Sequence, residues 1–247
     1  MENPQKLTKQ EKREVRKQEW QQKAENEGKK EQYKKVGIWI GVAAAVILGI
    51  FGLAMLVNSP SNTTTSSLKA PALSEKDIYT KGNAKAKVLL TEYGDFQCPA
   101  CASYHPIVNA VVEAYKDKIL FIYRDFPLVN AHQYALLSAR VAYAANKQNK
   151  YWEMYNLLYE NQTEWAKSTK AQDLFVGYAN NLKLDIDKFN ADLNSSEAKK
   201  FVDDALSTAT SIGLNSTPSF FINGSKIDNP GSFDEFKQLI DNELNKK

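Results

Sequence analysis

An uninterrupted apolar run near the N-terminus constrains this chain most strongly, because it separates a charged arm from everything that follows. Residues 36–57 form a stretch of 22 residues without a charged side chain. At about 1.5 Å of rise per residue, a helix of this length crosses a hydrocarbon core of about 30 Å. We therefore predict a single transmembrane helix over residues 36–57, in contact with membrane lipid.

The charged side chains on the two sides of this run predict its orientation. Residues 1–35 hold 11 Lys and Arg against 7 Asp and Glu, a net charge of +4, whereas the rest of the chain holds 21 basic and 22 acidic residues. Positively charged flanks stay in the cytoplasm. We therefore expect a single-pass protein of the cell membrane, with residues 1–35 as a cytoplasmic arm and everything after residue 57 extracytoplasmic.

A cleaved signal peptide is the alternative interpretation of the apolar run. The charged region before the run is too long for a signal peptide, the run exceeds the usual length, and no A-x-A cleavage site stands directly after it. An uncleaved signal-anchor therefore explains the segment better.

The remainder of the chain divides by composition into a linker and a folded domain. Residues 58–77 are rich in Ser, Thr, Pro and Asn, which is typical of a flexible linker. The folded domain is predicted over residues 78–247. Its nearly balanced charge and the lack of a basic stripe in its sequence argue against binding to nucleic acid.

The first half of this domain predicts a strand–helix–strand unit. The apolar runs at residues 87–93 and 119–123 are typical of buried strands, and Pro99 favours the start of a helix that extends to about residue 116. Such a unit is right-handed, and its two strands are parallel. The order of elements therefore indicates an α/β fold.

A helical block and a hairpin complete the domain. Five sets of apolar residues at helical spacing, between residues 134 and 212, predict helices. The Asn-Gly pair at 223–224 is typical of a hairpin turn between a strand at 219–222 and a returning strand. Ser232 and Glu235 form a capping box that predicts the start of a last helix.

Cys98 and Cys101 are the only cysteines in the chain. With Pro99 at the first helical position, Cys98 becomes the N-cap, where helix amides and the positive end of the helix dipole lower the pKa of its thiol. Cys101, one turn into the helix, is expected to be less exposed and less acidic. Outside the cytosol such a pair is not held reduced. We predict that Cys98 attacks a substrate or carries the mixed disulfide, and that Cys101 resolves it.

A zinc site is the alternative interpretation of the two cysteines. A structural zinc ion needs four ligands, and only His105 and His132 remain as further histidine or cysteine ligands. A strand followed by Cys-Pro-x-Cys at the start of a helix is the context of redox chemistry. We therefore predict thiol–disulfide exchange with no metal and no cofactor.

Glu92 and Pro218 each allow two interpretations from the residues alone. Glu92 lies six residues before Cys98. It is either a solvated carboxylate at the end of a strand, or a buried one with a raised pKa that accepts the proton of Cys101. Pro218 begins the late strand, where its peptide bond with Thr217 is either trans or cis.

Three segments resemble the membrane-anchored, DsbA-like thiol–disulfide oxidoreductases of the thioredoxin superfamily. They are residues 91–101 (TEYGDFQCPAC), residues 126–128 (FPL) with His132 after them, and residues 216–224 (STPSFFING). The resemblance covers the folded domain. It implies a thioredoxin-like α/β fold with an inserted helical subdomain at about residues 130–212.

The resemblance also implies roles for individual residues. Pro218 is expected to be cis and to pack opposite Cys98. Thr217 is expected to offer its backbone to an extended substrate peptide, which would bind as an added strand. Glu92 occupies the position of the family's buried carboxylate near the cysteines.

The function that the resemblance implies is that of an oxidase. Its disulfide passes to cysteine-containing exported proteins, and a membrane redox partner restores it. A disulfide reductase or isomerase of the same fold is the alternative, because Pro-Ala separates the cysteines in place of the Pro-His of the strongest oxidants, and Thr217 stands in place of their valine. A non-catalytic thioredoxin-like binding module is a third hypothesis.

Overall fold

The computed structural model describes residues 68–74 and 77–246. The predicted cytoplasmic arm (residues 1–35), the predicted transmembrane helix (residues 36–57) and most of the predicted linker lie outside the described residues. By its internal contacts the chain divides into two units, Met1–Thr64 and Thr65–Lys247, and the second unit contains every described residue. Within the described residues, no helix combines the length and apolar character needed to cross a bilayer.

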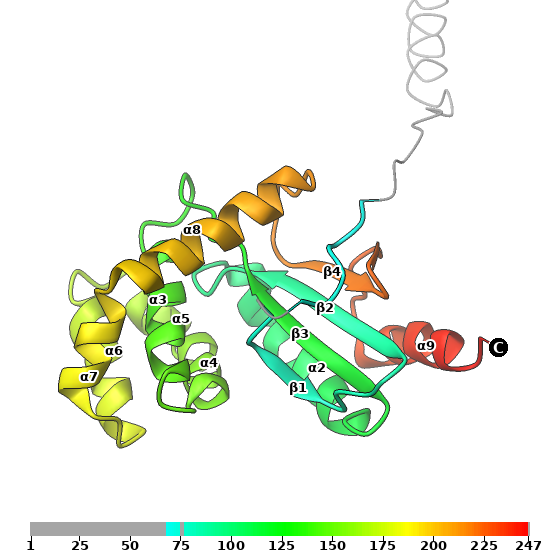
Figure 1. Ribbon diagram of the computed structural model, residues 1–247, viewed down its shortest axis with the longest axis horizontal. Coiled ribbons are helices and arrows are strands. Elements are labelled where there is room, and N and C mark those ends of the chain that lie inside the picture. Colours follow the sequence, from blue (N-terminus) through cyan, green and yellow to red (C-terminus); the bar gives the residue numbers. More distant parts are fainter. Residues whose placement is uncertain (1–67, 75–76, 247) are drawn as a thin grey trace, which may run out of the picture. The chain divides into compact units, whose positions relative to one another are not determined.

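In the part of the chain that the structure describes, a five-stranded mixed sheet has the order β1-β3-β2-β4-β5 (Figure 1). The strands are β1 (Thr80–Gly82), β2 (Val88–Gly94), β3 (Ile119–Asp125), β4 (Ser219–Ile222) and β5 (Ser225–Lys226). β2 and β3 are parallel, and β4 runs antiparallel to β2. The predicted parallel unit is therefore confirmed. The sequence does not predict β1, because three residues are too few to show a periodic pattern.

Helices cover the sheet and extend beyond it. α2 (Pro99–Ala114) connects β2 to β3, and α9 (Phe233–Leu244) follows β5. The other helices form the predicted insertion between β3 and β4, and Figure 1 shows α3–α7 gathered to one side of the sheet. These helices are α3 (Ala135–Asn146), α4 (Tyr151–Glu160), α5 (Gln162–Trp165), α6 (Ala171–Asn181), α7 (Ile186–Leu193) and α8 (Ser196–Ser211). The five predicted stripes correspond to α3, α4, α6, α7 and α8, whereas the four-residue α5 is too short to show a stripe.

Two apolar clusters pack against the sheet, and the alternation of side chains along β4 separates them. Phe220 belongs to the larger cluster, with Val108 of α2 and Phe236 of α9. Its neighbour Phe221 belongs to the smaller cluster, with Leu214. Because successive side chains of a strand point to opposite faces, the two clusters lie on opposite faces of the sheet. The inner strands are therefore buried on both faces, as their continuous apolar runs predict.

The segment that precedes the predicted domain pairs with the edge of the sheet. Lys69 forms an antiparallel bridge with Ser225 of β5. The backbone amide of Ala70 donates to the carbonyl of Gly224 at 2.9 Å, and the amide of Lys226 donates to the carbonyl of Leu68 at 3.1 Å. Residues 68–70, which we assign to the flexible linker at 58–77, therefore belong to the edge of the sheet. They pair there because β5 is an edge strand with unpaired backbone groups.

Two local predictions near the C-terminus are confirmed. Asn223 and Gly224 have φ angles of 50° and 78°, the positive values that a tight hairpin turn requires at both of its central positions. At the start of α9, the amide of Glu235 donates to the hydroxyl of Ser232 at 3.3 Å, which forms the predicted cap.

Candidate active site

Cys98 ends the short loop between β2 and α2. It is the N-cap of α2, with an extended backbone conformation, and Pro99 follows it as the first helical residue. Proline suits this position because its fixed φ matches a helix and its missing N–H would have had no helical partner. The predicted placement of Cys98 at the start of a helix is confirmed.

The two sulfurs differ in access and in acidity. Both cysteines are free thiols; Cys98 is 7% exposed, whereas Cys101 is fully buried. A hydrogen bond from Cys101 lowers the pKa of Cys98 to about 5, with smaller contributions from Thr217 and from the amides of Cys101 and Ala100, against the opposing effect of desolvation. Burial raises the pKa of Cys101 well above its ordinary value. The predicted asymmetry between the two thiols is confirmed.

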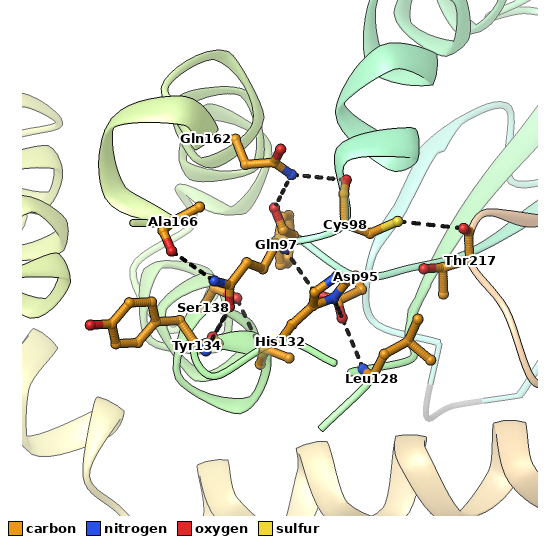
Figure 2. A network of polar contacts seen from close by, with 12 residues as sticks. Asp95, Gln97, Cys98, Leu128, His132, Tyr134, Ser138, Gln162, Ala166 and Thr217 are labelled. Carbon is orange, nitrogen blue, oxygen red and sulfur yellow. Dashed lines mark hydrogen bonds and ion pairs between the residues drawn. The ribbon is translucent and has the colours of Figure 1, made fainter. Parts of the chain in front are cut away.

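The loop before β4 brings a second segment to Cys98. The peptide bond between Thr217 and Pro218 is cis. Sγ of Cys98 lies 3.5 Å from the carbonyl oxygen of Thr217, so this loop lies directly against the sulfur (Figure 2). On the other side of the bond, the side-chain amide of Asn229 donates to the carbonyl of Pro218 at 2.7 Å. The cis bond and its place opposite Cys98, both implied by the resemblance, are confirmed.

Glu92 is buried behind the cysteines. The residue belongs to β2 and is 1% exposed. Its Oε2 has no hydrogen-bond partner among the described residues. Desolvation, followed by the charge of Cys98, raises the pKa of Glu92 to about 8. The charge of Glu92 in turn contributes to the raised pKa of Cys101. Of the two interpretations of Glu92, the structure confirms the buried carboxyl and excludes the solvated one.

Glutamine side chains fasten the segment before the cysteines to the helical insertion (Figure 2). The amide nitrogen of Gln162, in α5, donates to the carbonyls of Phe96 and Cys98 at 2.7 and 2.9 Å. The amide nitrogen of Gln97 donates to the carbonyl of Ala166 at 2.9 Å, and its oxygen accepts from the backbone of Tyr134 at 2.6 Å. Sequence reasoning misses these residues, because a glutamine that bonds to distant backbone carries no local pattern.

Asp95 anchors the same segment from the other side. One of its carboxylate oxygens accepts from the amide of Gln97 at 2.8 Å. The other accepts from the amide of Leu128 and faces Nδ1 of His132, both at 2.8 Å (Figure 2). His132 therefore serves this anchor. His105 contacts Asn156 at 2.9 Å.

The zinc interpretation has no ligand set in the region that the structure describes. His132 pairs with Asp95, and His105 contacts the side chains of Asn156 and Asn109. Among residues 68–74 and 77–246, no group of three or more His, Cys, Asp or Glu side chains is placed to hold a metal ion. The buried His105 and the half-buried His132 each have polar partners of their own, as histidines in a protein interior usually do.

The side chain of Tyr123, from β3, packs closely over Gly94 at the end of β2. A Cβ atom at Gly94 would lie 2.5 Å from the hydroxyl oxygen of Tyr123, so residue 94 must be glycine for the tyrosine ring to keep its place. The hydroxyl of Tyr123 pairs with that of Tyr159 at 2.7 Å. Tyr159 also packs against Phe96, with ring centroids 5.0 Å apart. The sequence gives no sign of this cluster beyond apolar spacing.

Comparison with known proteins identifies the family. The model of the thioredoxin family matches residues 74–242. A probable disulfide bond formation protein D from Bacillus cereus is 28% identical over 218 residues, which cover 85% of this chain and 96% of that protein. The crystal structure of alpha-DsbA1 from Wolbachia pipientis is 24% identical, covers 71% of this chain and 93% of its own, and superposes with a TM-score of 0.62. This last likeness establishes the fold.

Another comparison concerns part of a larger protein. The Na(+)/H(+) antiporter NhaA 1 of Mycolicibacterium vanbaalenii is 34% identical over 200 residues, which cover 77% of this chain and 31% of the antiporter. The chain thus spans about a third of the length of this curated relative, so the likeness concerns only that part of the antiporter. With its cysteine pair at a helix start and a family match over most of its length, the chain belongs to the thioredoxin family.

Proposed function

We propose that this chain is a thiol–disulfide oxidoreductase that introduces disulfides into cysteine-containing exported proteins. The observation that carries this proposal is the pair formed by Cys98, with a pKa of about 5, and the fully buried Cys101. A thiol that is ionised at neutral pH stabilises the reduced pair, and the disulfide is correspondingly a stronger oxidant. Each tenfold change in this equilibrium corresponds to about 30 mV in reduction potential.

The reaction proceeds by two exchanges at sulfur. A substrate thiolate attacks Sγ of Cys98 in the disulfide, the bond to Cys101 breaks, and the electron pair goes to Sγ of Cys101, which takes up a proton. A second substrate thiolate then attacks the substrate sulfur of the mixed disulfide, and Cys98 leaves as a thiolate. The substrate loses two electrons and gains a disulfide, and both cysteines end reduced, as they are in this structure, with Cys98 as a thiolate and Cys101 as a thiol.

Glu92 supplies the proton for the first exchange. Because burial raises its pKa to about 8, the carboxyl is protonated at neutral pH. The thiolate of Cys101, which burial makes unfavourable, takes this proton as the disulfide opens. When the pair is re-oxidised, Glu92 takes the proton back.

Thr217 provides the backbone edge against which the substrate lies. Its carbonyl is already within 3.5 Å of the Cys98 sulfur. An extended peptide that pairs with this backbone brings its own cysteine to Cys98, in the manner of an added strand. Pro218, held cis, fixes the direction of the Thr217 backbone beside the sulfur.

We place this activity on the extracytoplasmic side of the cell membrane. The support comes from the sequence, in which a charge-free run at residues 36–57 follows a basic arm. A single-pass anchor also suits exchange with a membrane redox partner, which restores the disulfide after each cycle. The Bacillus cereus relative, named as a probable disulfide bond formation protein, agrees with the oxidising direction.

The reduction potential tests the direction of electron flow. The full-length chain, in detergent, is equilibrated with glutathione buffers of graded ratio, and the oxidised fraction is measured by alkylation and mass spectrometry. A potential near that of strong oxidants, about −120 mV, supports the oxidase, whereas a value near the −270 mV or so of thioredoxin would overturn it in favour of a reductase. A Cys98→Ser chain that still promotes oxidative refolding would instead support a non-catalytic binding module.

A further inference from the structure

The loop that faces Cys98 is held on its other side by a residue of the connection between β5 and α9. The side-chain amide of Asn229 donates to the carbonyl of Pro218 at 2.7 Å. The carbonyl oxygen of Thr217, the preceding residue, lies 3.5 Å from Sγ of Cys98 (Figure 2). Two successive carbonyls of this loop therefore contact different partners, one the reactive sulfur and the other Asn229.

The pairing of β4 with β5 explains why Asn229 reaches this carbonyl. The two strands are antiparallel, with Phe221 opposite Lys226, and β5 ends at Lys226. Continued beyond β5, the same register sets Asn229 opposite Pro218. The side-chain amide of Asn229 therefore supplies the hydrogen bond that the backbone of a longer β5 would supply. Because proline has no N–H for the second bond of such a pair, the link between these two positions depends on this side chain.

The backbone of Asn229 is itself anchored to the helix that follows Cys98. The hydroxyl of Tyr104, in α2, donates to the carbonyl of Asn229 at 3.5 Å. The ring of Tyr104 also packs against that of Phe220, with centroids 5.3 Å apart. Pro230, next in the chain, favours an extended backbone at Asn229. Asn229 thus connects the loop beside Cys98 to α2.

The exposure of Asn229 limits what its side chain contributes to stability. Asn229 is exposed, whereas Pro218 is buried. An exposed side chain adds little to the apolar core, and water can donate to the carbonyl when the side chain is removed. We therefore expect the fold to persist without the side chain of Asn229. A water molecule, however, does not hold the carbonyl in one direction as a side chain on an anchored backbone does.

We propose that Asn229 is a positioning residue for peptide substrates: it holds the Pro218 carbonyl and so keeps the Thr217 backbone in the direction that an added substrate strand requires. The inference rests on the proposed function, in which an extended peptide pairs with Thr217. Asn229 bonds to the loop and not to the sulfur, so it affects the binding of a peptide more than the exchange of sulfurs. A small dithiol has no peptide backbone and therefore does not need this alignment.

Single-turnover reduction of the oxidised full-length chain in detergent tests the proposal, with an extended dithiol peptide and dithiothreitol as the two reagents. In both reactions the disulfide between Cys98 and Cys101 is reduced, and two thiols of the reagent are oxidised to a disulfide. For Asn229→Ala we expect the half-saturating peptide concentration to rise about fivefold at an unchanged limiting rate, a change that the loss of one hydrogen bond can produce. The rate with dithiothreitol should stay within about twofold of the native value.

Two further variants complete the comparison. Asn229→Asp keeps the shape of the side chain and replaces the N–H donor with an acceptor, so it should weaken the peptide at least as much as Asn229→Ala does, and it takes the place of that variant should the latter fail to fold. Asp228→Ala, at the exposed neighbouring position, should match the native chain with both reagents.

The outcomes separate this inference from the proposed function. An unchanged half-saturating peptide concentration in the folded Asn229 variants would overturn the inference alone. So would an equal loss of rate with the peptide and with dithiothreitol, or an equal rise of the half-saturating concentration in Asp228→Ala. A native chain whose disulfide the peptide does not reduce would overturn the proposed function and the inference with it.

Discussion

The side chain of Gln162 donates to the carbonyl of Cys98 at 2.9 Å, although the two residues belong to the helical insertion and to the start of α2. The same amide nitrogen donates to the carbonyl of Phe96 at 2.7 Å. The backbone of Cys98 is therefore held by α5. This helix belongs to the insertion, and not to the sheet or to the helices α2 and α9. The insertion contributes to the geometry of the site as well as to its surroundings.

Replacement of Gln162 by Leu should destabilise the domain. It leaves the buried carbonyl of Phe96 without its donor, whereas the carbonyl of Cys98 keeps the amide of Ala102 at 3.2 Å. An orphaned buried carbonyl costs about 1–3 kcal/mol, so we expect a loss of about 2 kcal/mol in the free energy of unfolding. Denaturant unfolding of the reduced chain measures it. Gln172→Leu, at an exposed position of α6, is the matched control and should change stability little. Equal unfolding midpoints for the two variants would contradict the role of Gln162.

The acidity of Cys98 should depend on the thiol of Cys101. Because the hydrogen bond from Cys101 is the largest cause of the low pKa, Cys98 should be half ionised at about pH 5, with the thiolate present above that pH. Cys101→Ala removes the donor and should raise the Cys98 pKa, whereas Cys101→Ser keeps a hydroxyl donor and should raise it less. Ultraviolet absorbance of the thiolate, followed against pH, measures each value. Identical titrations of the Ala and Ser variants would contradict this origin.

Stability should fall with rising pH because of Glu92. The folded chain holds the Glu92 proton up to about pH 8, whereas the unfolded chain releases it above about pH 4.5. The folded state therefore loses stability as pH rises from 4.5 towards 8, and Glu92→Gln should be more stable than the native chain at pH 7 by about 3 kcal/mol. Unfolding at pH 4 and pH 7 measures the difference, which should vanish at pH 4. A difference that is the same at both pH values would refute a raised pKa.

The same substitution should slow the chemistry. Glu92→Gln removes the proton donor for Cys101, so disulfide transfer to a dithiol peptide should slow by about 10- to 100-fold while Cys98 remains ionised. Stopped-flow fluorescence of the transfer measures the rate. Because the glutamine variant is expected to be more stable, a slower rate cannot be attributed to unfolding. An unchanged rate would remove Glu92 from the proposed mechanism.

A methyl group at residue 94 should displace the ring of Tyr123. In Gly94→Ala the new Cβ lies 2.5 Å from the hydroxyl oxygen of Tyr123 and 2.6 Å from its ring, so a strand or the ring must move, and we expect a loss of about 2 kcal/mol. Gly177→Ala, in α6, is the control: a Cβ there meets nothing within 4 Å, and the helix should gain up to about 1 kcal/mol. Thermal unfolding compares them; a shift of the same sign in both would contradict this account.

Local patterns predict the parts of the site that depend on neighbouring residues. Cys98 as N-cap follows from Pro99 beside it, and the hairpin at Asn223 follows from the glycine after it. The cis bond before Pro218 does not follow from local residues, since most such bonds are trans. It was expected only because the surrounding residues resemble a known family.

Interactions between distant segments lie beyond what such patterns reveal. Gln162 and Asp95 act on backbone atoms that their own neighbours do not specify. The pairing of Lys69 with Ser225 joins residues far apart in the chain, so composition alone assigned Lys69 to a flexible linker. Short elements such as β1 and α5 are set by the tertiary structure that surrounds them.

The bridge between Lys69 and Ser225 closes an edge of the sheet to pairing with other polypeptides. An uncovered outer strand recruits strands from other polypeptides and can seed aggregates. The exported proteins that we propose as substrates carry such strands before they fold. Residues 68–70 cover the edge strand β5. An unfolded substrate chain therefore cannot pair with this edge of the sheet, where it would lie away from the reactive cysteine.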